Sequence, residues 1–378
     1  MLKPLLTATD PAHYEEYLQE KIAAATDMLQ SYDLRLPQFD VFRSEPEFYR
    51  MRAEFAVFQE QGKLCFAMFE KHGRDKQRLF LDSFPVACRS INQGMHLLQK
   101  YAPDFEEITC RLFAVSFLAA SDDSLVISLN YHRHLDASLW KTAALKLRER
   151  LHAEGLRAEL LGRARKQKIT ALSDTITETL KVAGKNIRWL QTEGCFTQPN
   201  AGICRPLLEF ARSCAADCQD RDLLELYCGS GTFTVCLAEL FRKVLATEVN
   251  RAATAGALKN LALNGVVNTK VIRLSAVEVA EALQGTREFT RLKLASVDPR
   301  AYDFSTLLID PPREGLKFDS ARAFASRFQR IIYISCSPNS LGEDLQYLTR
   351  THHIARLAFF DQFPYTPHLE SGVLLLKD

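Results

Sequence analysis

Apolar and polar residues follow different patterns in the two halves of the chain. In the first half, segments that alternate with the period of a β-strand occur in pairs, and segments with the spacing of an amphipathic helix separate them. The expected strands are residues 53–59, 64–70, 108–119, 125–132 and 156–161, and the expected helices are residues 13–32, 89–101 and 139–153. Paired strands with helices between them predict an antiparallel α+β domain.

From residue 201 onwards, short apolar runs alternate with helical segments. The expected strands are residues 223–227, 244–247, 269–274, 306–309 and 331–335, with helices at residues 202–214 and 233–241. This alternation predicts a doubly wound parallel sheet. Two final strands, residues 354–360 and 372–376, are too close together for an intervening helix, so we expect the last strand to run antiparallel. Residues 282–305 are charged and irregular and predict no element.

Length and composition restrict the class of protein. A chain of 378 residues fits two domains or three, and we place the main division between residues 190 and 191. The formal net charge of +2 means that any surface for a polyanion must be a local patch. Ten cysteines include no C-x-x-C pair and no zinc spacing, so we expect neither a metal nor an iron–sulfur cluster. Scattered thiols suit a reducing cytoplasm, and the sequence offers neither a signal peptide among its first ten residues nor a membrane-spanning segment.

A glycine-rich turn follows the first strand of the second half. The sequence from residue 223 is Leu-Leu-Glu-Leu-Tyr-Cys-Gly-Ser-Gly-Thr-Phe, with Gly229 and Gly231 placed between a buried strand and a helix. Glycines let a ligand approach the backbone, and a helix N-terminus favours anionic groups. Glu248 follows about 20 residues later, where α/β nucleotide sites place an acid on ribose hydroxyls. The alternative for this stretch is a turn that serves packing alone.

The type of cofactor is narrowed by two residues near this turn. Thr234 stands where the dinucleotide fingerprint has its third glycine, and this disfavours the interpretation of the chain as an NAD-dependent dehydrogenase. Glu225 precedes the Gly-Ser-Gly turn, and this arrangement resembles motif I of the S-adenosylmethionine-dependent methyltransferases.

Residues that could bind a ligand or take part in catalysis follow several of the expected parallel strands. Because ligands bind beyond the carboxyl ends of such strands, we expect Tyr227, Glu248, Asp310 and Cys336 to share one crevice. Asp310 begins the segment Asp-Pro-Pro-Arg, whereas methyltransferases that act on amino groups normally have an aromatic residue at the position of Arg313. The sequence therefore disfavours an amine as the methyl acceptor.

Cys336 is a candidate nucleophile, although an isolated cysteine is more often inert packing. Ser337 and Pro338 have the character of an N-cap and a first helical residue, which places Cys336 beside a helix N-terminus. We expect the positive end of that helix to lower the pKa of the thiol.

A nucleophilic thiol has a clear use in methylating carbon 5 of uracil, a poor nucleophile on its own. Addition of a thiolate to carbon 6 makes carbon 5 reactive, and a base must then remove the carbon 5 proton. Glu370, which we place between the last two strands on the side of the crevice, is the candidate base, unless it is only an exposed loop carboxylate. His368 and Glu314 are rival bases.

A basic run is the main candidate for contact with a polyanion. Arg163, Arg165, Lys166 and Lys168 lie within six residues. They could line a phosphate-facing surface together with Arg50, Arg52, His132, Arg133 and His134. A solvated charged face explains the run equally well, and both interpretations stay open.

Several segments in a fixed order resemble one enzyme family over essentially the whole chain, the tRNA (uracil-5-)-methyltransferases of the TrmA type. The segments are Tyr-Arg-Met-Arg-Ala-Glu-Phe from residue 49, Asp-Ser-Phe-Pro from 82, Phe-Thr-Gln-Pro-Asn from 196, the glycine turn, Asp-Pro-Pro-Arg from 310, Ile-Tyr-Ile-Ser-Cys from 332 and Asp-Gln-Phe-Pro-Tyr-Thr from 361. The Ser-Cys-Ser-Pro and Asp-Gln-Phe-Pro segments are the most specific. The resemblance implies a class I, Rossmann-like methyltransferase domain over residues 191–378 and an α+β RNA-binding domain over residues 1–190.

The resemblance also implies roles for individual residues. Cys336 would be the nucleophile and Glu370 the proton acceptor, with S-adenosyl-L-methionine held by Gln198, Tyr227, Gly229, Gly231, Thr232, Glu248 and Asp310. Phe113 would stack near a uridine that is flipped out of the RNA. Thr232 departs from the family pattern, which favours Asn, and this puts cofactor affinity in doubt rather than the type of reaction.

The implied substrate is the T-loop uridine of tRNA that becomes ribothymidine. The related ribosomal-RNA enzymes usually add a barrel domain and an iron–sulfur cluster, for which this chain has neither the extra length nor clustered cysteines. We therefore expect the T-arm of tRNA as partner, with other RNAs that contain a T-loop-like structure as further candidates, and a monomeric enzyme. The alternatives are methylation of ribosomal or other structured RNA, a non-catalytic RNA-binding or RNA-folding module and, more remotely, a dehydrogenase.

Overall fold

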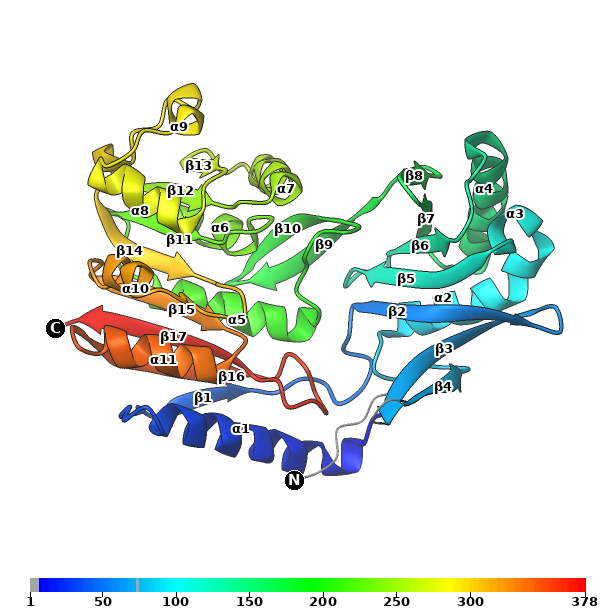
Figure 1. Ribbon diagram of the computed structural model, residues 1–378, viewed down its shortest axis with the longest axis horizontal. Helices are drawn as coiled ribbons and strands as arrows, with labels where there is room; N and C mark the ends of the chain where they lie inside the picture. Colours follow the sequence, from blue (N-terminus) through cyan, green and yellow to red (C-terminus); the bar gives the residue numbers. More distant parts are fainter. Residues whose placement is uncertain (1–6, 73–74) are drawn as a thin grey trace.

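A computed structural model of the chain describes residues 7–72 and 75–378, and residues 1–6, within the stretch considered as a signal peptide, lie outside this part. The described residues form a larger sheet in one half of the molecule and a smaller sheet in the other, with a two-stranded hairpin between them (Figure 1).

The larger sheet has the strand order β1-β16-β17-β15-β14-β11-β12-β13. Its strands are β1 (Phe39–Phe42), β11 (Asp222–Leu226), β12 (Lys243–Thr247), β13 (Thr269–Ile272), β14 (Phe304–Ile309), β15 (Arg330–Ser335), β16 (His352–Phe360) and β17 (Glu370–Lys377). Neighbouring strands from β13 to β15 are parallel, and β17 runs antiparallel to both β15 and β16. The predicted doubly wound sheet with an antiparallel last strand is confirmed.

Helices cover both faces of this sheet because successive strand residues point to opposite sides. Leu223 packs with residues of α5 and α6 in one apolar cluster, and Leu224 packs with residues of α8, α10 and α11 in another. The helices of this half are α1 (Tyr14–Gln30), α5 (Ala201–Cys214), α6 (Thr232–Leu237), α7 (Arg251–Leu263), α8 (Ala276–Gln284), α9 (Thr290–Leu294), α10 (Asp319–Ala325) and α11 (Pro338–Leu348), with short 3-10 turns η1 (Pro11–His13), η3 (Ala238–Leu240) and η4 (Pro299–Ala301). The stretch 282–305, for which no element was predicted, contains the end of α8, all of α9 and η4, and the start of β14, and none of these pieces is long enough to show a periodic pattern.

The smaller sheet has the order β4-β3-β2-β5-β6-β7-β8. Its strands are β2 (Arg52–Glu60), β3 (Lys63–His72), β4 (Asp75–Leu81), β5 (Leu112–Ala119), β6 (Leu125–Tyr131), β7 (Ala158–Ala164) and β8 (Gln167–Thr170). Its helices are α2 (Arg89–Tyr101), α3 (Glu106–Thr109) and α4 (Ala137–Ala153), with the short turn η2 (Ala102–Asp104). The expectation of an antiparallel sheet is wrong for one pair, because β6 and β7 are parallel. The chain crosses over through α4 between them, and such a helix lets two neighbouring strands run in the same direction.

The hairpin between the sheets was not predicted. It consists of β9 (Thr175–Val182) and β10 (Lys185–Thr192), which pair antiparallel. Leu180, Val182 and Trp189 pack against α5 in the apolar cluster on one face of the larger sheet.

The N-terminal segment belongs to the larger sheet. Strand β1 pairs in parallel with β16, and α1 lies beside α11 (Figure 1). The sheets therefore divide the chain differently from the expected division at residue 190, which stays a prediction about independent domains. Among the described residues, no helix has both the length and the apolar character needed to cross a bilayer.

Candidate active site

The glycine turn lies at the carboxyl end of β11, as predicted. Gly229 and Gly231 have φ angles of 54° and 80°, in the left-handed region, and Gly231 begins α6. A Cβ on Gly231 would lie 3.2 Å from the Cβ of Ala257, so this position also needs a glycine for space. Tyr227 has a φ of 61°, which costs a non-glycine residue conformational energy and is typical of functional sites.

Glu248 is tied directly to this turn. It follows β12, and its carboxylate accepts hydrogen bonds from the backbone N–H of Gly229 at 3.1 Å and of Asn250 at 2.7 Å. The sequence placed the acid and the turn in one crevice, and the structure brings them into contact.

Residues of the turn line a hollow on each of its two sides. One hollow includes Tyr227 and Glu248 together with Pro312 and the start of α8. The other includes Thr232 and Gln198 together with residues of the β9–β10 hairpin. The side-chain amide oxygen of Gln198 accepts a hydrogen bond of 2.6 Å from Gln362, a residue that the sequence analysis did not single out.

Asp310, Cys336 and Glu370 converge at neighbouring strand ends. Asp310 follows β14 and Cys336 follows β15, the next strand of the sheet. Glu370 begins β17, where its neighbour Ser371 pairs with Ser335, the residue before Cys336. The antiparallel register therefore brings the candidate base beside the candidate nucleophile.

The electrostatics of Cys336 differ from the expectation. Ser337 caps α11 by accepting a hydrogen bond from the N–H of Ser340, as predicted. The pKa of the thiol is nevertheless raised, first by burial and then by the carboxyls of Glu370 and Asp310, whereas Arg313 opposes the rise. The predicted lowering of the pKa is therefore wrong, because burial and two acids outweigh the helix N-terminus.

The acids of this region are themselves poorly solvated. Burial and the charge of Asp310 raise the pKa of Glu370, and burial raises that of Asp310. Glu225 is buried behind the turn, and neither of its carboxyl oxygens has a hydrogen-bond partner among the described residues. Burial raises the pKa of Glu225 to about 8.

The two rival bases have less suitable surroundings. Glu314 is exposed and accepts a hydrogen bond from Lys317 at 3.0 Å. His368 lies 3.4 Å from the guanidinium of Arg313, and burial together with that cation lowers the pKa of the imidazole. Glu370 is buried, and burial raises its pKa, whereas the pKa of His368 is lowered.

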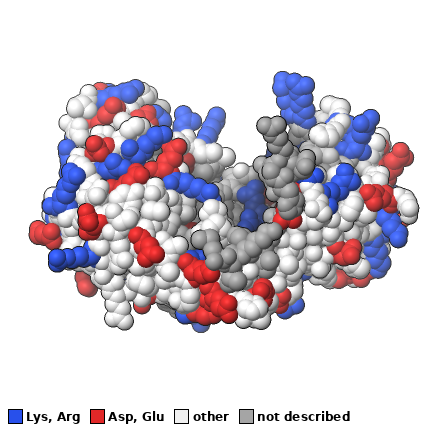
Figure 2. Space-filling view, turned by 60° about the horizontal axis from the view of Figure 1, so that its bottom comes forward, with Lys and Arg blue, Asp and Glu red and all other residues white. Residues whose placement is uncertain are grey.

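The cations of the predicted RNA-facing run differ in their surroundings. On the face shown in Figure 2, Lys and Arg side chains are interspersed with Asp and Glu over both halves. Arg163 pairs with Glu193 and Lys168 pairs with Asp174, whereas Arg165 and Lys166 lie exposed at the turn between β7 and β8.

Arg50 and Arg52 differ in exposure. The guanidinium of Arg50 donates a hydrogen bond of 2.9 Å to the carbonyl of Arg52 and lies 5.9 Å from the ring centroid of Phe363. Burial lowers the pKa of Arg50, and Arg52 is exposed at the start of β2.

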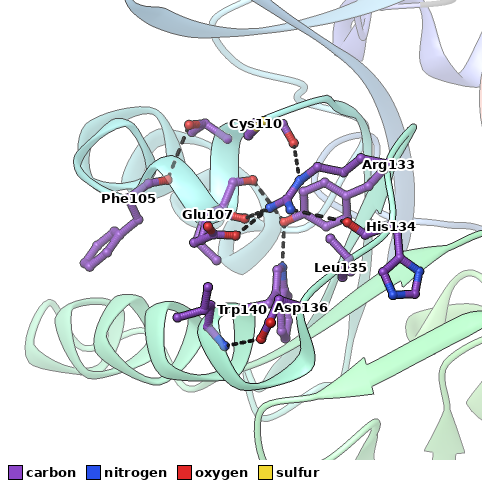
Figure 3. Close-up of polar contacts among 12 residues, drawn as sticks. Phe105, Glu107, Cys110, Arg133, His134, Leu135, Asp136 and Trp140 are labelled. Carbon is purple, nitrogen blue, oxygen red and sulfur yellow. Dashed lines mark hydrogen bonds and ion pairs between the residues drawn. The ribbon is translucent and has the colours of Figure 1, made fainter.

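Phe113 and its neighbours form a separate surface on the smaller sheet. Phe113 is 39% exposed, and its ring stacks on that of His132 with centroids 3.7 Å apart. The guanidinium of Arg133 donates hydrogen bonds to the carboxylate of Glu107 and the carbonyl of Cys110 (Figure 3). An aromatic ring is thus available on this surface, while the neighbouring arginine has a structural contact.

Within residues 7–72 and 75–378, no group of three or more His, Cys, Asp or Glu side chains is arranged to hold a metal ion.

Comparison with known proteins identifies close similarities. A family model described as "tRNA (Uracil-5-)-methyltransferase" matches residues 13–378. The tRNA/tmRNA (uracil-C(5))-methyltransferase of Vibrio vulnificus strain CMCP6 is 43% identical over 366 residues, 97% of each chain. The protein of the same name from Photobacterium profundum is 42% identical over 369 residues, 98% of each chain.

A solved structure shares the fold. The Pyrococcus abyssi tRNA (uracil-54, C5)-methyltransferase, in complex with S-adenosyl-L-homocysteine, superposes with a TM-score of 0.70 at 18% identity. The match covers 96% of this chain and 83% of the archaeal chain.

Proposed function

The chain belongs to the tRNA (uracil-5-)-methyltransferase family, and from this premise we propose that it methylates carbon 5 of the T-loop uridine of tRNA. The methyl donor is S-adenosyl-L-methionine, and the product is ribothymidine. The archaeal relative acts on uracil 54 of tRNA, which supports the same position here. The observation that carries the proposal is the convergence of Cys336, Glu370 and Asp310 at the ends of neighbouring strands.

The residues around the glycine turn fit the donor. Glu248 lies beside the turn with a carboxylate suited to ribose hydroxyls, and Gly231 sits where a Cβ would meet Ala257. Tyr227 and Glu248 line one side of the turn, and Gln198 and Thr232 line the other. When bound, S-adenosyl-L-methionine supplies an electrophilic methyl group. We assign these residues, with Gly229 and Asp310, to holding and orienting it.

Cys336 acts as the nucleophile in this proposal. Its thiolate adds to carbon 6 of uracil, and the electron pair of the ring double bond moves to make carbon 5 nucleophilic. Carbon 5 is then methylated while the sulfur stays bonded to carbon 6. Burial beside two carboxyls raises the pKa of the thiol, and a thiolate of higher pKa is intrinsically more nucleophilic.

Glu370 acts as the proton acceptor. After methylation, its carboxylate removes the proton from carbon 5, the double bond between carbons 5 and 6 re-forms, and the thiolate of Cys336 leaves. A buried carboxylate of raised pKa is a stronger base than an exposed one.

In this proposal, RNA is recognised by residues of the smaller sheet. A stacked base would fit the exposed ring of Phe113, and Arg52, Arg165 and Lys166 offer charge to phosphates. Because the bacterial relatives are named for tRNA and tmRNA, a T-loop-like structure in tmRNA is a second candidate substrate.

The substrate is tested by mass spectrometry of nucleosides from purified tRNA of cells with and without this protein. We expect ribothymidine to disappear from the tRNA of cells that lack it. Unchanged ribothymidine would remove tRNA from the proposal, and the same assay on purified tmRNA examines the second candidate.

The covalent mechanism is tested on denaturing gels with labelled T-arm RNA and S-adenosyl-L-methionine. Cys336→Ala should form no protein–RNA adduct, whereas Glu370→Gln should accumulate one because the carbon 5 proton stays in place. RNA with 5-fluorouridine should trap the wild type similarly, since fluorine cannot be removed as a proton. Glu314→Gln is the matched control and should turn over normally. An adduct with Cys336→Ala, or normal turnover with Glu370→Gln, would contradict the assigned roles.

A further inference from the structure

A buried lysine of the N-terminal helix holds the start of the loop that leads to Glu370. The side chain of Lys21 is 6% exposed and forms an ion pair with Asp361, whose side chain is 1% exposed. The ammonium of Lys21 also donates a hydrogen bond of 3.0 Å to the carbonyl of Phe363. The second carboxyl oxygen of Asp361 accepts a hydrogen bond of 2.9 Å from the hydroxyl of Tyr14. One helix, α1, therefore supplies both side chains that hold Asp361.

The position of Asp361 ties these contacts to the active site. Asp361 follows Phe360, the last residue of β16, and Phe360 is the cross-strand partner of Glu370. Residues 361–369 thus form the loop between β16 and β17, and Asp361 directly follows the residue that pairs with the proposed base. A shift of Asp361 would move Phe360 and, through the pairing of Phe360 with Glu370, the start of β17.

The rest of the loop contacts Gln198 of the site and the segment between β1 and β2. Gln362 bonds to Gln198 at 2.6 Å, and the carbonyl of Pro364 accepts a hydrogen bond of 3.1 Å from Tyr49. The hydroxyl of Tyr365 bonds to the carbonyl of Pro46 at 2.9 Å. The loop is therefore fixed at several points, and the ion pair is the anchor that directly follows Phe360, the cross-strand partner of Glu370.

A buried ion pair adds little to the free energy of unfolding, but it can fix the relative position of the two segments that carry its charges. Removing two charges from water costs about as much as their attraction returns, so an apolar pair of similar volume often stabilises a protein equally well. Each charge, however, strongly disfavours any arrangement that leaves the other unpaired. Lys21 and Asp361 therefore disfavour arrangements of the loop that separate the two charges.

We propose that Lys21 is a positioning residue for proton removal: through Asp361, it holds the start of the 361–369 loop so that the carboxylate of Glu370 faces carbon 5. The inference rests on the proposed function, because it assumes that Glu370 is the base. It goes beyond that function by giving the N-terminal helix, outside the strands that carry the catalytic residues, a part in one chemical step.

The test compares Lys21→Met with Lys21→Arg on the full-length chain. Lys21→Met keeps most of the side-chain volume and removes the cation, whereas Lys21→Arg keeps the charge. Glu15→Gln is the control on the same helix, because it breaks the exposed pair between Glu15 and Arg43 without touching the loop. Glu370→Gln is the reference for a missing base. The readouts are single-turnover methylation, the fraction of RNA held in the denaturation-resistant adduct, and thermal unfolding.

A base that is displaced by about an ångström slows its step by roughly a hundredfold. We therefore expect Lys21→Met to methylate but to turn over about a hundredfold more slowly, with the adduct accumulating as in Glu370→Gln. Lys21→Arg should recover most of the turnover, and Glu15→Gln should behave as the wild type. A purely structural role would instead lower the folded fraction and the turnover together, without any adduct.

The outcomes separate the inference from the proposed function. If Glu370→Gln accumulates adduct and folded Lys21→Met does not, the positioning role is wrong and the mechanism stands. If Glu370→Gln accumulates none, the proposed mechanism itself fails. Should Lys21→Met not fold, Tyr14→Phe removes one hydrogen bond to Asp361 and keeps the ring against Tyr365, whose centroid is 6.1 Å away. That variant should show a smaller accumulation of the same adduct, and none would overturn the inference.

Discussion

At the scale of single residues, the site keeps its reactive groups from ionising easily in the absence of RNA. Cys336 and Glu370 each have a raised pKa, and the charge of the acid contributes to the rise at the thiol. A thiol that is mostly protonated is protected from oxidation, and it becomes a strong nucleophile once its proton leaves. The surroundings that disfavour ionisation of the Cys336 thiol therefore also make its thiolate a stronger nucleophile in the covalent step.

Glu248 offers a residue-scale prediction about the cofactor. Glu248→Ala removes a charged acceptor for ribose hydroxyls, which is worth about 1.5–3 kcal/mol, or roughly ten- to a hundredfold in affinity. Glu248→Gln keeps one acceptor oxygen for the N–H of Gly229 and should lose less. Calorimetric titration of the folded variants with S-adenosyl-L-methionine measures both. Equal affinity in the wild type and Glu248→Ala would exclude this carboxylate from the cofactor site.

Glu225 gives a prediction about pH and stability. Its pKa is about 8 in the folded protein, against an ordinary value of 4.5. The folded state therefore holds a proton that the unfolded chain has already lost, so the contribution is complete below about pH 4.5 and disappears as the pH rises through 8. Over that window the free energy of unfolding should fall by on the order of 1 kcal/mol per pH unit from this group.

Urea unfolding of the wild type and Glu225→Gln between pH 5 and about 9 tests this slope. The variant should show a shallower fall, because it has no proton to lose. Glu314→Gln, at an exposed position, should keep the wild-type slope. Parallel curves for the wild type and Glu225→Gln would mean that Glu225 is not held protonated.

The chemistry of the site was largely predictable at this scale, but its electrostatics were not. The residue types after the parallel strands predicted that Tyr227, Glu248, Asp310 and Cys336 would gather at one edge, because strand ends meet there whatever the details of packing. The raised pKa of Cys336 depends on how deeply the thiol is buried and on the register that brings Glu370 beside it. Neither burial depth nor register can be obtained from one sequence. The pair of Lys21 and Asp361 was missed for the same reason, since its partners are 340 residues apart.

At the scale of secondary-structure elements, the basic run forms the β7–β8 hairpin, and its four cations differ in exposure and in ion pairing. Strands β7 and β8 turn at Arg165 and Lys166, which are exposed, whereas Arg163 and Lys168 are bound to acids of the neighbouring segment. Only the first two are therefore available to a phosphate without breaking an ion pair. The sequence showed four equivalent charges because it does not reveal Glu193 and Asp174 as their partners.

The hairpin yields a prediction about RNA binding. Replacing Arg165 and Lys166 by Gln should weaken tRNA binding and reduce the slope of log affinity against log salt by about one for each phosphate that is no longer neutralised. Replacing Arg163 and Lys168 by Gln is the matched control, and it should lower thermal stability more than it changes the salt slope. Filter binding over a range of salt concentrations measures the slope. If the control pair changed the slope and the exposed pair did not, the RNA would bind elsewhere on the hairpin.

Elements with strong periodicity were predicted well, and short strands in polar sequence were not. Helix α2 was predicted at its observed bounds, because its apolar residues repeat at helical spacing and Pro85 and Cys88 precede it in a turn. Strands β9 and β10 were missed although buried and exposed residues alternate along β9, because most of their residues are polar. Strand β1 has four residues, too few to define a period, and pairing with β16 decides its conformation.

At the scale of the whole molecule, the chain starts in the half that contains the larger sheet, forms the smaller sheet, and then comes back to complete the larger one. Helix α1 and strand β1 complete the larger sheet, residues 52–170 form the smaller one, and the rest of the chain finishes the first (Figure 1). One apolar cluster includes residues of both halves, among them Leu18, Phe55 and Leu345. A division of the chain by sequence position alone therefore separates β16 from its edge partner and leaves Asp361 without Lys21.

This arrangement predicts how fragments behave. A fragment of residues 191–378 should be poorly soluble and unfold without a cooperative transition, because it exposes the edge of β16, uncovers α11 and removes both side chains that hold Asp361. Residues 1–43 joined by a flexible Gly/Ser linker to residues 171–378 restore β1, α1 and the β9–β10 hairpin, and this chain should melt cooperatively. The same linked chain with Leu18→Asp is the matched control, since it adds the segment but places a charge at a position that is 1% exposed. Calorimetry and size-exclusion chromatography measure the outcome. A soluble and cooperatively folded 191–378 fragment would show that the division at residue 190 marks a true domain, and that α1 and β1 are appended to a sheet that is stable without them.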